Sequence, residues 1–423
     1  MPKVAKKTRV QLSLLLLAYV AIEGCSFVVI ALSPRFFSEE IRRTPEVFAE
    51  QSAKIRQIME STPQHLLQFD AFLGWRYRAG YKDPRNEMNQ QGLRSTRAYA
   101  PTPSPGVLRI AAFGDSFVYG NEVANAESWP FLIEEMFPRL EVLNYGVGGY
   151  GTDQAYLRFL MEGAALAPDI VLIGFAPVDL ARTVNVYRRF LSNLELPLIK
   201  PRFVLDRDGR LSLLSNPITQ VTDYGKYLED PRGVIELGRD DYWYESVVYE
   251  NPLYDLSATV RVLTTLWVRV RRRYLDGERL LEGDGVVQAV KFKSESPAFR
   301  IQTMLFEKFK ADALALRAVP IVVILPDGES VTHARLGRQK IFDPLLEHLR
   351  KSAVAYIDLS DAFAAEAKTT PQGRWFMPGG HYSGAGNKMI AAWLAHQVEE
   401  RVKADCLSRP ENRLRACRAL NTF

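Results

Sequence analysis

The sequence predicts an α/β protein with a parallel central sheet, an inserted region and an N-terminal transmembrane helix. Three observations support this prediction. From residue 107 onward, short apolar segments alternate with segments of helical periodicity, as in parallel sheets covered by helices on both faces. The alternation stops between about residues 181 and 300. An apolar stretch of about 23 residues comes before the alternating region.

The composition is that of a globular protein with ample length for a core. The chain has 423 residues, of which 47% are hydrophobic and 24% charged, values far from those of disordered chains. The net charge of +5 is small for this length, and part of it comes from Lys3, Lys6, Lys7 and Arg9. We therefore expect no nucleic-acid partner.

The first segment, residues 1–32, is predicted to be a cytoplasmic tag followed by a membrane anchor. Residues 10–32 contain one ionisable side chain, Glu23, and about 20 apolar residues suffice to cross a bilayer as a helix. Membrane lipid is thus the expected partner of this helix. The basic flank predicts a cytoplasmic N-terminus. A cleaved signal peptide and a lipidation site at Cys25 are competing interpretations. The apolar run is long for a signal peptide, and no typical small-x-small cleavage site follows Ala31.

Residues 33–106 are predicted to link the anchor to the main domain. The stretch "EVFAEQSAKIRQIME" (residues 46–60) has helical spacing. Residues 71–106 show little periodicity and contain "LGWRYRAG" and "NQQGLRST", so we expect an extended arm lying on the domain. The segment "PTPSPG" then precedes the first strong strand pattern.

The alternating region supplies five strand predictions and three helix predictions. The strands are expected at residues 107–113, 141–147, 169–175, 319–325 and 354–359. The helices are expected at residues 128–137, 152–166 and 386–402. Ser128 stands where a helix cap is expected, with Pro130 in the first turn.

The region of about residues 181–300 is predicted to be an insertion or cap over the sheet edge. Residues 203–214, "FVLDRDGRLSLL", indicate a hairpin with Asp-Gly near its turn. Residues 257–275 indicate a helix, whose arginine-rich end we expect to be solvated. In the C-terminal tail, residues 403–423, Cys406 and Cys417 either close a short disulfide loop or remain two thiols.

Three polar stretches follow predicted strands and converge at their carboxyl ends, where ligands bind in open α/β sheets. The first, "FGDSFVYG", places Ser116 after a strand, in a turn that Gly114 allows. A serine hydroxyl is a weak nucleophile and needs a base within hydrogen-bonding reach. The second is "NYGVGGYGTDQ" (residues 144–154), whose glycines permit close backbone approach. The third contains His381, in a glycine-rich loop before the last helix.

With these stretches in this order, residues 110–402 resemble the SGNH, or GDSL-type, hydrolases, and especially membrane-anchored bacterial members with a similar "GWR…N…GLRS" arm. The resemblance implies a flavodoxin-like three-layer α/β/α domain at residues 107–402. It also implies hydrolysis or transfer of ester-linked acyl groups, often on carbohydrates. Ser116 matches the nucleophile and His381 the general base, and the amides of Ser116 and Gly149 match the oxyanion hole. The implied location is the bacterial inner membrane in a single pass, with the domain periplasmic or extracellular, and no metal or cofactor is required.

Two positions depart from the family pattern. Val178 stands where an asparagine usually donates to the oxyanion, and Pro378 replaces the aspartate that usually orients the histidine. Asp358 is the expected substitute orienter, whereas Asp361 fits helix capping better. Asn144 or Asn185 could replace the missing donor, and Val178 could line an acyl pocket.

The function that follows is a membrane-anchored, extracytoplasmic serine esterase or O-acyltransferase acting through an acyl-Ser116 intermediate. The alternative is a catalytically degraded relative that binds carbohydrate or assists assembly of an envelope polysaccharide. Four aromatic residues flank the motifs and would suit stacking on a sugar ring, although aromatic residues near strand ends are more often core: Tyr119, Tyr150, Trp375 and Tyr382.

Overall fold

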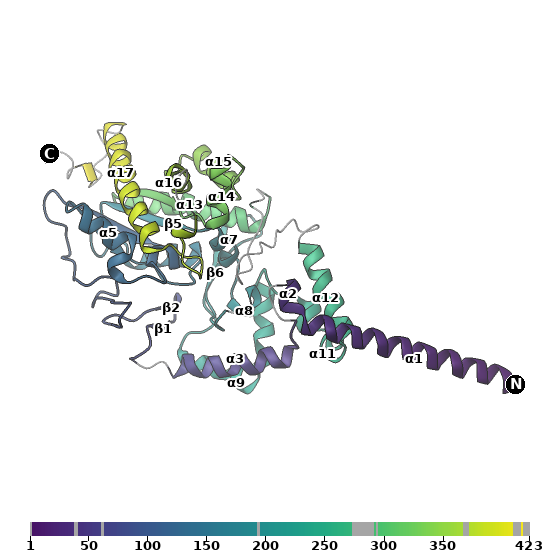
Figure 1. The fold of residues 1–423 in the computed structure, drawn as a ribbon. Helices are drawn as coiled ribbons and strands as arrows, with labels where there is room; N and C mark the ends of the chain where they lie inside the picture. The colour runs from purple at the N-terminus through teal and green to yellow at the C-terminus, as the bar shows by residue number, and fades with distance from the viewer. Residues whose placement is uncertain are drawn as a thin grey trace.

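The structure is a computed structural model that describes most of the chain. The described residues are 2–37, 41–60, 63–192, 195–272, 292, 295–366, 372–408 and 416–417. The α/β fold class predicted from the sequence is confirmed, because five parallel strands form the centre and helices surround them (Figure 1).

The central sheet has the strand order β4-β3-β5-β8-β9, and all neighbouring pairs are parallel. Its strands are β3 (Leu108–Phe113), β4 (Leu140–Asn144), β5 (Ile170–Phe175), β8 (Val319–Ile324) and β9 (Tyr356–Asp358). In chain order this is the 2-1-3-4-5 arrangement of flavodoxin-like sheets, in which the topology reverses beside the first strand. The expected ligand site therefore lies outside the carboxyl ends of β3 and β5.

Side chains alternate along each strand, so the sheet has two apolar faces. On β3, Ala111 and Phe113 belong to one core cluster, whereas Ile110 and Ala112 belong to the other. The first cluster includes residues of α6 (Thr152–Glu162) and α13 (Pro297–Ala315), and the second includes residues of α5 (Trp129–Met136) and α17 (Gly384–Ser408). The result is a three-layer α/β/α domain.

Shorter helices surround the sheet. They are α4 (Ser116–Tyr119), α7 (Pro177–Thr183), α14 (Gly328–Arg335), α15 (Asp343–Lys351) and α16 (Ser360–Glu366). Ser128 occupies the N-cap position of α5, but its hydroxyl donates to the Asn125 carbonyl and does not cap the helix. The first amide of α5, that of Trp129, donates to Asn387 Oδ1 of α17.

The linker before the main domain has the helix predicted near residues 46–60, and its arm is more structured than expected. It contains α3 (Thr44–Met59) and an antiparallel hairpin of β1 (Leu67–Asp70) and β2 (Gly74–Tyr77). Leu73, Trp75 and Leu93 are almost fully buried and belong to the same core cluster as α6. The arm thus forms part of the core on one face of the sheet.

The inserted region lies between β5 and β8. It contains α8 (Arg188–Leu191), β6 (Arg202–Leu205), β7 (Leu211–Leu214), α9 (Lys226–Glu229), α10 (Ser246–Tyr249), α11 (Pro252–Leu256) and α12 (Ala258–Val270). The predicted hairpin is confirmed as the antiparallel pair β6–β7. The expectation of a solvated basic end on α12 is wrong for Arg272. Its side chain is 12% exposed, pairs with Glu245 and donates to the Trp243 carbonyl at 3.0 Å.

The N-terminal helix α1 (Pro2–Ala31) extends away from the rest of the ribbon, followed by α2 (Ser33–Phe37) (Figure 1). Its segment Val10–Ala31 is long and apolar enough to cross a membrane, a property shared by membrane spans and signal sequences. At the other end of the chain, Cys406 and Cys417 form a disulfide, with their Cα atoms 5.5 Å apart. Of the two possibilities left by the sequence, the loop is the one present.

Candidate active site

Ser116 is the first residue of α4, directly beyond the carboxyl end of β3. Asp115 caps this short helix, because its carboxylate accepts the Phe117 amide at 2.8 Å. Ser116 is 3% exposed. The serine is therefore held in a defined position at the edge of the sheet where the strand order predicts a site.

His381 meets Ser116 although 265 positions separate them in the chain. The Nε2 atom of His381 lies 2.9 Å from the Ser116 hydroxyl oxygen, and the two share a hydrogen bond. The imidazole ring packs against the ring of Phe117, with 5.1 Å between centroids. The distance between His381 Nε2 and the Ser116 hydroxyl oxygen is within the reach required of a nucleophile and its general base.

Glu122 is the carboxylate that contacts His381, and the sequence analysis did not identify it. Its Oε2 lies 2.7 Å from His381 Nδ1, and its carboxylate also accepts the backbone amides of His381 and Gly379 at 3.2 and 3.0 Å. A Cβ on Gly379 would stand 2.5 Å from Glu122 Oε1, so a larger residue there would displace the carboxylate from this position. The three side chains form a Ser116–His381–Glu122 array.

Asp358, the expected orienter of His381, has other partners. Its carboxylate pairs with the Lys340 ammonium and accepts the hydroxyl and amide of Ser360. Asp358 ends β9 at the far edge of the sheet, whereas Ser116 follows β3. The expectation that Asp358 orients His381 was wrong. It chose the carboxylate at the end of the strand that precedes His381 in the chain, whereas the loop that carries His381 contacts Glu122, in the segment after α4.

The electrostatics of Glu122 favour its ionised form. Partial burial raises the pKa of this carboxyl, but hydrogen bonds from the His381 ring and amide and from the Gly379 amide outweigh burial, so its pKa lies below the ordinary value. A carboxylate bonded to Nδ1 fixes the neutral imidazole with its proton on that atom, which leaves Nε2 free to accept the serine proton.

The arm braces the segment that carries Glu122. Arg94 is 4% exposed, and its guanidinium donates to the carbonyls of Tyr119, Gly120 and Val123 at 2.6, 2.5 and 2.7 Å. These carbonyls flank Glu122 on both sides. The "GLRS" stretch of the arm therefore fixes the backbone from which the carboxylate projects.

The glycine-rich stretch after β4 packs closely on α4. A Cβ on Gly146 would come within 2.2 Å of the Tyr119 nitrogen. The arm fixes Gly148 from the other side: its carbonyl accepts Trp75 Nε1 at 3.0 Å, and its amide donates to the Tyr77 hydroxyl at 2.9 Å. Gly149 follows directly. Within the described part of the chain, the amides of Ser116 and Gly149 donate to no protein acceptor.

The side chains expected to replace the missing oxyanion donor are engaged elsewhere. Asn144 donates to the Tyr119 carbonyl and accepts the Gly146 amide. Asn185 donates to Asp241 and to the Tyr187 carbonyl within the inserted region. Both residues thus stabilise backbone turns, which corrects the expectation that either supplies a donor.

The residues expected to contact substrate are core residues. The hydroxyls of Tyr119, Tyr150 and Tyr382 donate to Asn86, the Trp75 carbonyl and the Pro326 carbonyl, and each ring is at most 2% exposed. Trp375 and Val178 are each 6% exposed and belong to the core cluster of α5 and α17. The four aromatic side chains are too deeply buried to stack on a sugar, so that expectation was wrong. The expectation that Val178 lines an acyl pocket stays a prediction.

A buried ionic cluster lies next to the turn that carries Ser116. Arg182 of α7 pairs with Asp115 and Asp179 at 3.1 and 3.3 Å, and both carboxylates are 1% exposed. Burial, together with the neighbouring Asp115, raises the pKa of Asp179 well above its ordinary value. Asp179 and Arg182 thus hold α7 to the turn that carries Ser116.

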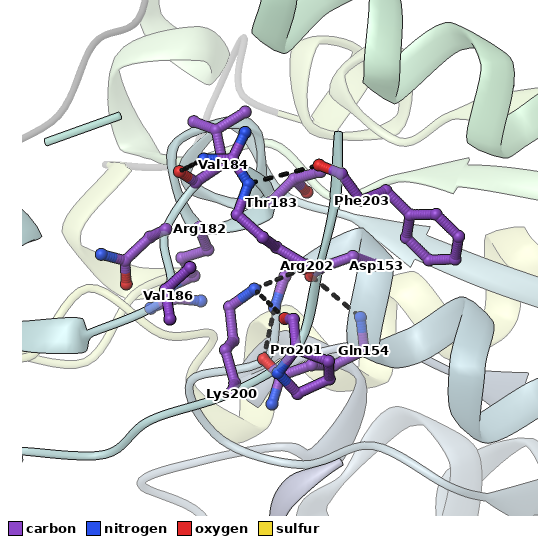
Figure 2. A network of polar contacts seen from close by, with 12 residues as sticks. Asp153, Gln154, Arg182, Thr183, Val184, Val186, Lys200, Pro201, Arg202 and Phe203 are labelled. Carbon is purple, nitrogen blue, oxygen red and sulfur yellow. Dashed lines mark hydrogen bonds and ion pairs between the residues drawn. The ribbon is translucent and has the colours of Figure 1, made fainter. Parts of the chain in front are cut away.

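A second polar network joins the inserted region to α6 and is drawn in Figure 2. Lys200 pairs with Asp153, and both side chains are completely buried. Arg202 donates to the Val184 carbonyl at 2.8 Å. Gln154, next to Asp153, donates to the Leu73 carbonyl of the arm at 2.7 Å. The insertion, α6 and the arm are thereby connected through buried polar contacts.

Comparisons with known proteins give remote structural matches. No family model matches the chain, and no curated protein matches it. A lipase/acylhydrolase from Enterococcus faecalis is 12% identical, covering 70% of this chain and 97% of its own, with a TM-score of 0.32. A variant of an acetyl xylan esterase from Geobacillus stearothermophilus is 11% identical, covering 68% and 93%, with a TM-score of 0.33. An α/β hydrolase from the metagenome of Lake Arreo is 13% identical, covering 68% and 94%, with a TM-score of 0.34. Similarity at this level does not identify a reaction or a substrate.

Proposed function

We propose that this protein is a serine esterase or O-acyltransferase of the SGNH hydrolase type, anchored in a membrane by α1. The observation that carries the proposal is the hydrogen-bonded array in which His381 lies 2.9 Å from the Ser116 hydroxyl and 2.7 Å from Glu122. A nucleophile, a base and an orienting carboxylate in this order are what acyl transfer through an acyl-serine requires.

In the first half of the reaction, Ser116 Oγ attacks the carbonyl carbon of the ester while its proton passes to His381 Nε2. Glu122 stabilises the resulting imidazolium through the Nδ1 hydrogen bond. The C–O bond of the tetrahedral intermediate then breaks, the alcohol leaves with the proton from His381, and the acyl group remains on Ser116. In the second half, water or a sugar hydroxyl gives its proton to His381 and attacks the acyl carbon. The bond from that carbon to Ser116 Oγ then breaks, Ser116 takes the proton back from His381, and the free acid or the acylated sugar leaves.

The oxyanion is proposed to be stabilised by the amides of Ser116 and Gly149. Ser116 begins α4, so its amide is one of those left unbonded at a helix start. The absent asparagine donor, replaced by Val178, would otherwise contribute roughly 100- to 1000-fold in rate. We therefore expect a modest turnover with simple esters.

The proposed substrate is an acylated carbohydrate outside the cytoplasm, which is the substrate class that the family resemblance implies. A binding-only relative was the alternative, motivated by Pro378 and Val178. Glu122 weakens it, because His381 is paired with a carboxylate despite the proline. The burial of Tyr119, Tyr150 and Trp375 weakens it further, since these rings offer no stacking surface.

The test uses the full-length protein in detergent with p-nitrophenyl acetate and with acetylated oligosaccharides. We expect Ser116→Ala to lower kcat by at least about 1000-fold, as removal of a nucleophile does in serine hydrolases. A fluorophosphonate probe should label the native chain and not the variant. Equal release of p-nitrophenol by both proteins would refute the esterase assignment. Adding a sugar acceptor and measuring free acetate against acetylated sugar then separates hydrolysis from transfer.

A further inference from the structure

The exposed side chains of α11 and α12 are all apolar. The large ones are Leu253, Leu256, Leu263, Leu266, Trp267 and Val270, which we call the apolar face. Along α12 the exposed positions recur every three or four residues, so they form one stripe. Their exposure is high for leucine and tryptophan, for example 60% at Leu263 and 52% at Trp267. A continuous apolar stripe of this kind on the surface marks an interaction site.

The polarity of α12 is inverted relative to a surface helix of the same protein. In α15 the exposed positions are Glu347, Arg350 and Lys351, and Leu345 and Leu349 are buried. In α12 the exposed positions are apolar, and Arg261, 5% exposed, is on the buried side. A helix that places apolar residues outward is matched to an apolar environment and not to water.

The start of α12 contacts the candidate membrane span. The Glu23 carboxylate of α1 accepts the hydroxyls of Ser257 and Thr259 at 2.9 and 2.7 Å, together with the amide of Ala258. Ser26 of α1 also shares a hydrogen bond with Thr259 at 3.0 Å. The start of α12 is thus capped by a carboxylate from inside the apolar segment of α1, and the two helices cross there (Figure 1).

The position of this contact sets the depth of α12. Glu23 precedes the end of the apolar segment at Ala31 by 8 residues, which corresponds to about 12 Å along a helix. Amphipathic helices that lie in the membrane plane have their apolar side about 5–10 Å below the headgroups. The start of α12 is therefore near that depth whenever α1 crosses the bilayer.

We propose that α11 and α12 lie in the outer leaflet of the bilayer that α1 crosses, with the apolar face in contact with lipid. The proposal rests on α1 being a retained membrane span, as stated above. It also accounts for Glu23: a carboxylate within an apolar span is costly unless protein groups satisfy it, and here α12 supplies them. Trp267 is a residue type enriched at membrane interfaces. The main domain is then held at the membrane at two places.

The test is nitroxide accessibility in the full-length protein, reconstituted in vesicles of phosphatidylethanolamine and phosphatidylglycerol. In a Cys25→Ser background, single labels are placed by Leu263→Cys, Trp267→Cys and Val270→Cys. Leu336→Cys is the matched control, because Leu336 is 57% exposed at the end of α14. Leu16→Cys, within the span, reports on α1 itself. All these positions are exposed, so the substitutions leave the core intact.

We expect labels on the apolar face to collide several-fold more with oxygen, relative to a water-soluble nickel chelate, than the label at position 336 does. Ratios equal to that of the control would overturn the proposal. Protection from both reagents would also overturn it, in favour of a protein partner or a second copy of the chain. A water-exposed label at position 16 would overturn the proposal together with the span on which it rests. None of these outcomes involves Ser116, so a failure here is distinguishable from a failure of the esterase assignment.

Discussion

Two pairs of a basic and an acidic side chain can be compared in this protein. One lies at the rim of the central sheet, and the other is buried between the insertion and α6. His381–Glu122 is partly open, with side-chain exposures of 21% and 27%. Lys200–Asp153 is completely closed, with both side chains at 0%. Each pair joins segments far apart in the chain. Only the rim pair has a further partner suited to chemistry, the Ser116 hydroxyl.

The two pairs therefore differ in solvent access as well as in residue type. At the rim, the proposed function uses the partial exposure of His381 and Glu122 for the departure of an alcohol with its proton. In the interior, the remaining bonds of the pair go to the Pro201 carbonyl and the Gln154 amide. Burial lowers the pKa of Lys200 to about 8, because desolvation outweighs the attraction of Asp153. The interior pair joins the insertion to α6.

The largest expected effect is on the rim pair. Glu122→Gln removes the acceptor that fixes the His381 tautomer, and we expect kcat for p-nitrophenyl acetate to fall by roughly 100- to 10,000-fold, as for the equivalent change in serine proteases. Asp358→Asn is the matched control, because its carboxylate binds Lys340 and Ser360. We expect that variant to keep its kcat. The reverse result would return the orienting role to Asp358.

The interior pair should affect stability instead. Lys200→Met leaves Asp153 buried without its partner, and we expect a loss of about 3–5 kcal/mol in the free energy of unfolding, measured by urea denaturation. The double variant Lys200→Met/Asp153→Leu should recover most of this loss, because an apolar pair needs no desolvation. A single variant as stable as the native chain would show that the pair does not hold the insertion.

Arg94 tests whether the arm positions the reactive pair. Arg94→Lys retains the charge but loses the planar fork that reaches three carbonyls. We expect kcat to fall by about 10-fold with KM little changed, and stability to fall by about 2 kcal/mol from unsatisfied buried carbonyls. Partial rescue of kcat in Arg94→Ala by added guanidinium would separate positioning from general destabilisation. Unchanged kcat in both variants would show that Arg94 does not position Glu122 for the reaction.

The smallest expected effect is on the free energy of unfolding at acidic pH. The pKa of Glu122 in the folded protein lies below the ordinary value of 4.5. The unfolded chain therefore binds more protons just below pH 4.5, so the stabilisation from Glu122 is complete above that pH and is lost as the pH falls through the folded pKa. The stability difference between the native chain and Glu122→Gln should shrink over this interval in urea titrations at stepped pH. A difference that grows on acidification would contradict the pKa direction.

The sequence by itself determined the architecture and two of the three residues of the Ser116–His381–Glu122 array. Apolar runs of strand length, separated by helical periodicity, are local consequences of burial on both faces of a parallel sheet, so they can be read from neighbouring residues. Ser116 and His381 stand in glycine-rich turns directly beyond such units, and parallel strands bring their carboxyl ends to one edge. The β6–β7 hairpin has the same local origin in its turn residues.

Only the tertiary structure decided which carboxylate faces His381 and what the aromatic residues do. Glu122 lies six positions after Ser116, and its one signal in the sequence is that it is the first acidic residue after the nucleophile motif. Its pairing with His381 depends on the position of the loop that contains Gly379, which no short-range sequence pattern predicts. Tyr119, Tyr150 and Tyr382 are likewise buried because segments distant in the chain cover them. The physical reason is that periodicity reports a residue's own burial, whereas the choice of partner depends on how remote backbones approach each other.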